Sequence, residues 1–208
     1  MEYSKEFKTA LSAFSNIEKD RLIFRLLKKD PLLSKKLYFE LIDPETTDDK
    51  RNVMEEHVQE RVAMVSKYIG NPKYFLTIIR KISAEITEHV KITTDKFGEV
   101  SLNLLLIDSI LKHNDDLSRQ RFDNVYKLYL YLINKTVRSL LLIKKLDEDY
   151  WMEFDEQLES LKKKIMQNHY LSKLFVNNEI DINWLRSENI PEHFDLIIKD
   201  IKSQGFLR

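Results

Sequence analysis

The chain has 208 residues, of which 43% are hydrophobic and 33% charged, so it is long and apolar enough for one folded domain over residues 1–208 and is not a disordered chain. Its 34 basic and 34 acidic residues cancel, so the field of the whole molecule does not favour unspecific binding to nucleic acid or to an anionic membrane. The absence of cysteine excludes disulfides, thiolate catalysis, zinc ribbons and iron–sulfur clusters.

The N-terminal stretch, MEYSKEFKTALSAF, alternates charged and apolar positions. It lacks the uninterrupted apolar core that a signal peptide needs. The most apolar runs of the chain, Leu104 to Ile107 and Leu128 to Ile133, are far shorter than the ~20 residues of a membrane span. We therefore expect a cytoplasmic protein with no membrane partner.

The next stretch, Asn16 to Pro44, contains two helix-breaking prolines. Pro31 favours the start of a helix, and Pro44 favours the end of one. The sequence NIEKDRLIFRLLKKDPLLSKKLYFELIDP resembles the N-terminal helix pair of some uncharacterised bacterial all-helical proteins, although Pro31 separates the two helices more sharply than in that pattern. The resemblance implies an all-α fold, and it implies no function or site.

Two further helices are predicted on either side of Gly70-Asn71-Pro72, where a C-terminal glycine directly precedes an N-terminal proline. Apolar residues recur at helical spacing in both segments, at Met54, Val58, Val62, Val65 and Ile69, and at Phe75, Ile78, Ile79, Ile82, Ile86 and Val90. The pattern predicts a helical hairpin of Val53 to Ile69 with Pro72 to Val90. Gly98 then lies in a predicted polar loop.

The second half of the chain predicts another hairpin, of Ser101 to Leu111 with Leu117 to Lys144, and a helix from Asp147 to Asn168. As one helix, Leu117 to Lys144 would be ~42 Å long, and we expect it to be the central element. With no sustained two-residue alternation, the sequence predicts an all-α domain of about nine helices, packed as antiparallel hairpins in a bundle or a short HEAT-like α-solenoid. The lack of a fixed sequence period weakens the solenoid alternative.

Glu85, Glu88 and His89 are common metal ligands within one helical turn. A helical di-metal site needs Glu three residues before a histidine, on two helices. The residue three before each of the five histidines is apolar, and none of these histidines is followed by Glu as in the zincin motif. We therefore expect no metal site and no cofactor, and we interpret His89 as a histidine at the edge of the core.

Pairs of carboxylates keep one enzymatic alternative open. Helical nucleotide pyrophosphatases bind magnesium through Glu-x-x-Glu on one helix and Glu-x-x-Asp on another. The first form occurs at Glu85 and Glu88 and at Glu156 and Glu159, and the second at Glu192 and Asp195. With 34 acidic residues in the chain, such matches also arise by chance, and the doubled Glu that leads the motif is absent. No catalytic residue is assigned.

A basic stripe is the surface feature that we favour for function. On a wheel of roughly 100° per residue, one side of the segment from Leu117 to Lys145 carries five cations and three polar residues: Arg121, Asn124, Lys127, Tyr131, Asn134, Lys135, Arg138 and Lys145. A helix face that is only exposed to solvent would show the same pattern of charged and polar residues. The alternative is a partner-binding site for an acidic group, centred on Arg121, Lys127, Tyr131, Lys135 and Arg138.

These observations favour a non-enzymatic helical module that binds or scaffolds a protein partner, and the basic stripe suggests an acidic one. Two alternatives stay open, a magnesium-dependent nucleotide hydrolase and an accessory protein that associates with nucleic acid. Convergence of the carboxylates would support the hydrolase. A basic stripe that is open rather than neutralised by acids would support binding of a polyanion.

Overall fold

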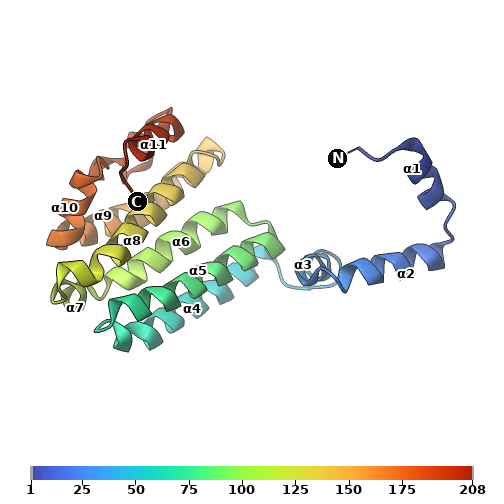
Figure 1. Ribbon diagram of the computed structural model, residues 1–208, viewed down its shortest axis with the longest axis horizontal. Coiled ribbons are helices and arrows are strands. Elements are labelled where there is room, and N and C mark those ends of the chain that lie inside the picture. Colours follow the sequence, from blue (N-terminus) through green and yellow to red (C-terminus); the bar gives the residue numbers. More distant parts are fainter. Residues whose placement is uncertain (1, 208) are drawn as a thin grey trace.

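The computed structural model describes residues 2–207, which form eleven α-helices and four short 3₁₀ helices and contain no strand (Figure 1). The α-helices in chain order are α1 (Lys5–Ser12), α2 (Asn16–Leu27), α3 (Pro31–Leu41), α4 (Thr47–Val65), α5 (Pro72–Thr93), α6 (Lys96–Leu111), α7 (Asn114–Ser118), α8 (Phe122–Ile143), α9 (Asp155–Gln167), α10 (His169–Asn177) and α11 (Phe194–Ser203). The prediction of an all-α domain is confirmed, with eleven helices where about nine were expected.

Two of the predicted long helices are interrupted. The segment expected as one helix from Leu117 to Lys144 is divided, because Arg121 takes an extended backbone with φ −63° and ψ 137° before α8 begins. The segment expected from Asp147 to Asn168 begins instead as a 3₁₀ helix, Glu148–Phe154, and continues as α9. Polar residues 119–121, which separate α7 from α8, are exposed or only half-buried, so no core contact holds them in a helix.

Helix α6 occupies the centre of the fold, rather than the longer α8 that the sequence favoured. It contacts α4, α5, α8 and α9, and 11 of its 16 residues are buried. Helices α4 and α5 pack together, and so do α6 and α8, as the two predicted hairpins require. One contiguous core extends from Met54 to Leu207 and contains no residue of α1, α2 or α3. A single domain over residues 1–208 stays a prediction. The HEAT-like order of the hairpins stays a prediction.

The start of α6 corrects the predicted loop at Gly98. Asp95 caps the helix, because its Oδ1 accepts a hydrogen bond from the Gly98 backbone N–H at 2.8 Å. A Cβ atom at position 98 would lie 2.1 Å from Asp95 Oδ2. Glycine at this position therefore allows the cap to form, and the helix begins at Lys96.

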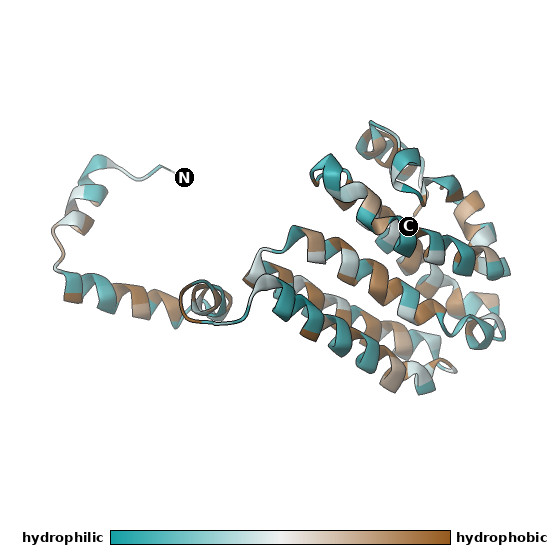
Figure 2. Ribbon diagram, turned by 180° about the vertical axis from the view of Figure 1, so that it is seen from behind, coloured by the Kyte–Doolittle hydropathy of each residue, from teal (hydrophilic) through white to brown (hydrophobic). Residues whose placement is uncertain are grey.

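Helices α1, α2 and α3 form an arm that extends from the body (Figures 1 and 2). No residue of these three helices is buried, although α3 packs against α5. Each helix has a local start signal: Ser4 caps α1, Ser15 and Glu18 form a capping box on α2, and Asp30 caps α3 ahead of Pro31. The arm is therefore helical for local reasons and not because a core covers it.

Candidate functional site

A groove lies between α5 and α8 on the side of α8 that carries the basic stripe. Its volume is about 500 Å³, and it is lined by Arg80, Tyr126, Lys127, Leu130, Tyr131 and Asn134. The five α8 residues recur at intervals of four, as 126, 130 and 134 and as 127 and 131, so they form two neighbouring rows on one side of the helix. Arg80 of α5 supplies the facing wall.

The residues of the basic stripe have different surroundings in the structure. Lys127 and Tyr131 line the groove, and Lys135 follows Tyr131 one turn further along α8. Arg138 is not an open cation, because its Nη2 lies 3.0 Å from Glu99 Oε1. Arg121 is exposed at the N-terminal end of α8 and does not line the groove. The structure therefore brings together the middle of the predicted stripe and separates its two ends.

Three residues of the groove were not part of the predicted stripe, Arg80, Tyr126 and Leu130, and Arg80 alone of these comes from another helix. A helical wheel orders the residues of one helix, and it contains no information about which neighbouring helix packs beside it. The guanidinium carbon of Arg80 and the Nζ of Lys135 each lie 5.8 Å from the centre of the Tyr131 ring. Both distances fall within the range of a cation–π contact. The ring of Tyr131 thus joins cations from two helices.

Lys135 is held in a setting that disfavours its charge. Its Nζ donates a hydrogen bond to the Ser83 hydroxyl at 2.5 Å, and among residues 2–207 it makes no ion pair. Burial, with repulsion from Arg138, lowers the pKa of Lys135 to about 8. Burial also raises the pKa of Tyr131, although the nearby Ser83 hydroxyl acts in the opposite direction. An anion in the groove would relieve the unbalanced positive charge.

Arg80 and Lys127 are both exposed, and within the described residues neither forms a salt bridge. A carboxylate or phosphate can accept charge-assisted hydrogen bonds from them. Tyr126 and Leu130 add apolar surface between the cations. The groove therefore combines two open cations with an apolar floor, which suits an acidic group that is attached to an apolar side chain.

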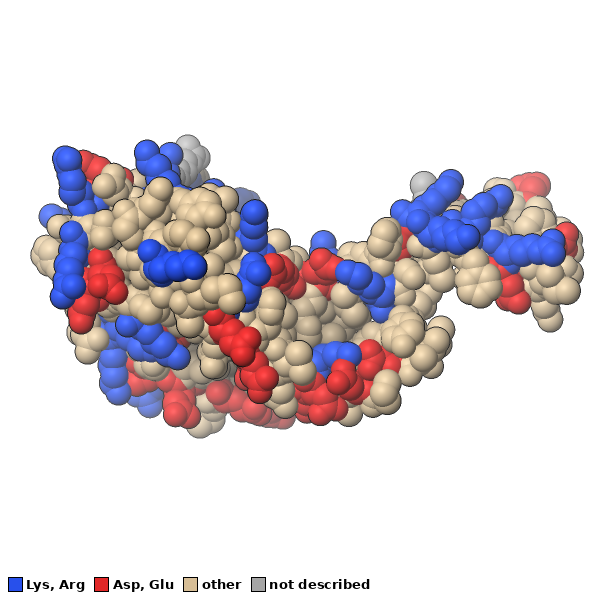
Figure 3. Space-filling model, turned by 90° about the horizontal axis from the view of Figure 1, so that it is seen from below, with Lys and Arg blue, Asp and Glu red and all other residues tan. Residues whose placement is uncertain are grey.

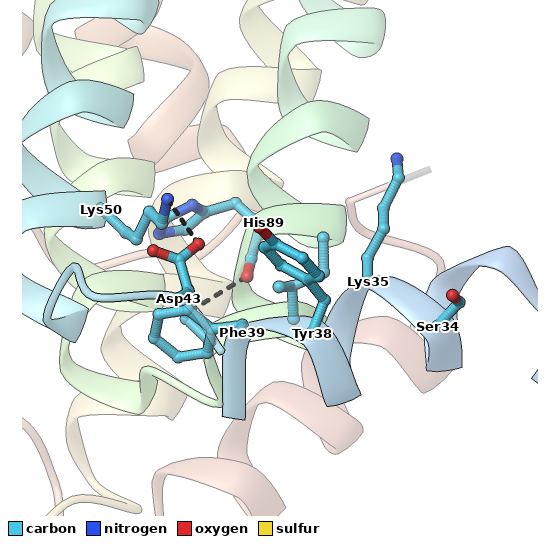
Figure 4. A pocket seen from close by; sticks show the side chains of 9 residues that line it. Ser34, Lys35, Tyr38, Phe39, Asp43, Lys50 and His89 are labelled. Atoms are coloured by element: carbon cyan, nitrogen blue, oxygen red, sulfur yellow. Dashed lines mark hydrogen bonds and ion pairs between the residues drawn. The ribbon is translucent and has the colours of Figure 1, made fainter. Parts of the chain in front are cut away.

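A second cavity, of about 490 Å³, lies where α3 meets α5 and the start of α4 (Figure 4). It contains cations as well, but they have partners. Lys35 Nζ lies 2.6 Å from Glu88 Oε1, and Lys50 Nζ lies 2.9 Å from Asp43 Oδ2 and also pairs with Glu45. Because its lysines are neutralised by carboxylates, this cavity is a weaker candidate for binding an anion than the groove.

The cluster of Glu85, Glu88 and His89 is divided among separate contacts. Glu85 accepts from His57 Nε2 at 2.8 Å and from Arg61 Nη2 at 3.3 Å, whereas Glu88 pairs with Lys35. His89 lies beside the second cavity, and its buried Nε2 has no hydrogen-bond partner among the described residues. Burial lowers the pKa of His89. The three side chains therefore do not converge on one point.

The carboxylate pairs of the magnesium alternative are also distributed over the surface. Glu156, Glu159, Glu192 and Asp195 are exposed, and Glu159 lies 3.7 Å from Lys163. Within residues 2–207, no group of three or more His, Asp or Glu side chains is arranged to hold a metal ion. No convergence of carboxylates thus supports the hydrolase alternative in this part of the chain.

No helix within residues 2–207 combines the length and the apolar character that crossing a bilayer requires. Comparisons of the chain with protein-family profiles, with curated proteins and with solved structures gave no match. The resemblance of residues 16–44 to a bacterial helix pair therefore gains no support from these comparisons. The groove between α5 and α8 is the candidate functional site on the basis of its geometry and charge alone.

Proposed function

We propose that this protein is a helical interaction module that binds an acidic segment of a partner protein in the groove between α5 and α8. The observation that carries the proposal is the meeting of Arg80, Lys127 and Lys135 around Tyr131 with no carboxylate paired to any of the three in the described chain. Cations on a solvated face are usually close to acids of neighbouring helices. Here Glu99, the acid whose charge acts on Lys135, is engaged by Arg138.

The size and lining of the groove favour a peptide segment over a nucleic acid. A volume of about 500 Å³ accepts one or two side chains. Binding of a nucleic acid depends on a long array of cations along the phosphate backbone. The groove offers a short cluster, and the chain as a whole carries no net positive charge. An acidic segment with one apolar or aromatic residue matches both the cations and the apolar floor.

The proposal is tested with a fluorescein-labelled oligoglutamate peptide that contains one leucine. We expect fluorescence anisotropy to show binding that weakens as salt is raised, because screening reduces the attraction between charges near the surface. The double variant Arg80→Glu/Lys127→Glu should reduce binding at least about tenfold, since like charges then face each other. In affinity capture from the source cells, this double variant should also fail to retain the partners that the wild-type protein binds.

The matched control is Lys173→Glu/Lys199→Glu, which makes the same change in net charge at exposed positions of α10 and α11. Equal loss of binding in the control and the groove variant would show that only net charge matters, and the groove proposal would be wrong. A labelled DNA duplex is titrated in parallel. Tighter binding of the duplex than of the peptide, lost with Arg80→Glu/Lys127→Glu, would instead favour the nucleic-acid alternative.

A further inference from the structure

The arm leaves a large amount of apolar surface without cover. Of the 20 large apolar side chains that are exposed in residues 2–207, 11 lie between Tyr3 and Ile42. Helix α2 has only 12 residues and no buried side chain. Isolated helices of ~12 residues are only marginally stable in water, even in favourable sequences. The arm therefore has the features of an element that completes its packing against another surface.

One side of α2 carries a stripe of basic and apolar side chains. At roughly 100° per residue, four residues of α2 and its C-cap residue Lys28 fall within an arc of about 100°: Ile17, Arg21, Phe24, Arg25 and Lys28. All five are exposed, and among the described residues the three basic side chains make no ion pair. Figure 3 shows basic side chains gathered on the arm.

The solvent face of α4 carries the opposite charge. Five exposed residues of α4 fall within an arc of about 80°: Asp49, Val53, Glu56, Glu60 and Met64. Neither Glu56 nor Glu60 makes an ion pair within residues 2–207. Acidic side chains gather along the edge of the body beside the arm in Figure 3.

Three positions of each stripe match when the helices are antiparallel. Ile17, Arg21 and Arg25 are spaced by four residues, and so are Met64, Glu60 and Glu56. Each interval corresponds to a rise of about 6 Å. Ile17 then faces Met64, Arg21 faces Glu60, and Arg25 faces Glu56. Ile17 and Met64 are 65% and 62% exposed, so the apolar pair gains cover at the same time as the charges pair.

We propose that α2 of one copy docks on the outer face of α4 of a second copy, so that two chains exchange arms reciprocally. Within one chain α2 extends away from the body, with α3 between them (Figures 1 and 2). Its own α4 is therefore not the surface that it meets. In such a dimer a twofold axis relates the two chains, and the contact between α2 of one chain and α4 of the other occurs twice. This contact involves none of the residues of the α5–α8 groove. The dimer proposal is therefore independent of the proposed function.

The experiment measures the mass of the full chain in solution by sedimentation equilibrium. Wild type should dimerise at low salt and dissociate at high salt. Arg21→Glu/Arg25→Glu should weaken dimerisation by roughly a hundredfold or more, because acidic side chains then face Glu56 and Glu60. Glu56→Arg/Glu60→Arg should do the same from the other side. The control Lys173→Glu/Lys199→Glu should dimerise as wild type does.

The decisive step is to mix the two reversed variants. Both docking contacts of a mixed pair are attractive again, so a heterodimer should form from two monomeric variants, and a chain with all four reversals should regain the homodimer. Circular dichroism confirms that each variant is folded. A wild-type chain that stays monomeric at every concentration at low salt, or a dimer that neither reversal weakens, would overturn the proposal. So would a monomeric wild type whose arm binds vesicles of phosphatidylserine and phosphatidylcholine, since the arm would then be a membrane-surface element.

Discussion

The guanidinium of Arg51 donates a hydrogen bond from Nε to Asp95 Oδ2 at 2.6 Å, and this contact joins α4 to the first turn of α6. Asp95 is nearly inaccessible, with its side chain 4% exposed, and it also caps α6. Arg51 lies 4.9 Å from the centre of the Phe97 ring. One carboxylate therefore serves both the start of the central helix and the packing of α4 against it.

Replacing Arg51 with methionine should destabilise the fold by about 3 kcal/mol. Loss of one partner leaves the other charge buried without compensation, which typically costs about 3–5 kcal/mol in a buried pair. Urea denaturation followed by circular dichroism measures the change. Lys163→Met is the matched control, because it breaks an exposed pair with Glu159 that should contribute less than ~1 kcal/mol. An equal decrease in the free energy of unfolding in Arg51→Met and Lys163→Met would contradict the role of the Arg51–Asp95 pair.

Gly98→Ala should also destabilise the chain, by roughly 1–3 kcal/mol, because the new methyl group overlaps the capping carboxylate. Its Cβ would lie 2.1 Å from Asp95 Oδ2 and 2.9 Å from Arg51 Nε. Gly70→Ala is the control, since no atom lies within 4 Å of a Cβ at that position. Thermal denaturation compares the two. If the melting temperature of Gly98→Ala equals or exceeds that of Gly70→Ala, the cap tolerates the methyl group and the prediction is wrong.

Tyr129→Phe should cost about 1–2 kcal/mol, because it removes a hydrogen bond between two fully buried side chains. The Asn168 amide donates to Tyr129 Oη at 3.0 Å and to Asn114 Oδ1 at 3.1 Å, and it caps α10 with its own oxygen. The control is Tyr74→Phe, whose ring is 48% exposed. Chemical denaturation of both variants gives the comparison, and an equal change in free energy of unfolding would refute the prediction.

Lys135 should make stability depend on pH in the alkaline range. Its pKa is lowered from 10.5 to about 8 in the folded state, so between these values the unfolded chain binds more protons than the folded one. The free energy of unfolding therefore rises with pH across this window. Relative to wild type, Lys135→Met should be most favourable below pH 8 and lose that advantage as the pH rises towards 10.5.

Thermal melts of Lys135→Met and wild type across this range measure the effect, with Lys127→Met as the exposed control from the same helix. A difference between Lys135→Met and wild type that stays constant with pH would mean that the amine titrates as it does in an unfolded chain. The same melts report whether the Ser83 hydrogen bond outweighs the cost of burying the charge.

The middle of the basic stripe was predictable because helical periodicity is a property of a single segment. Lys127 and Tyr131 lie where the wheel placed them, on one side of α8. The contribution of Arg80 and the pairing of Arg138 with Glu99 were not predictable, since they depend on which helices become neighbours. The lowered pKa of Lys135 has the same origin, because burial is a property of the packed structure.

Local sequence determined where the helices are. Pro31 and Pro72 begin α3 and α5 as predicted, and apolar spacing marks the buried faces of α4 and α5, because these signals act between residues that are close along the chain. Tertiary structure alone decided that α6 is central, that the arm leaves the body, and that Gly98 belongs to a helix. These outcomes depend on contacts between distant segments, which no periodicity within one segment encodes.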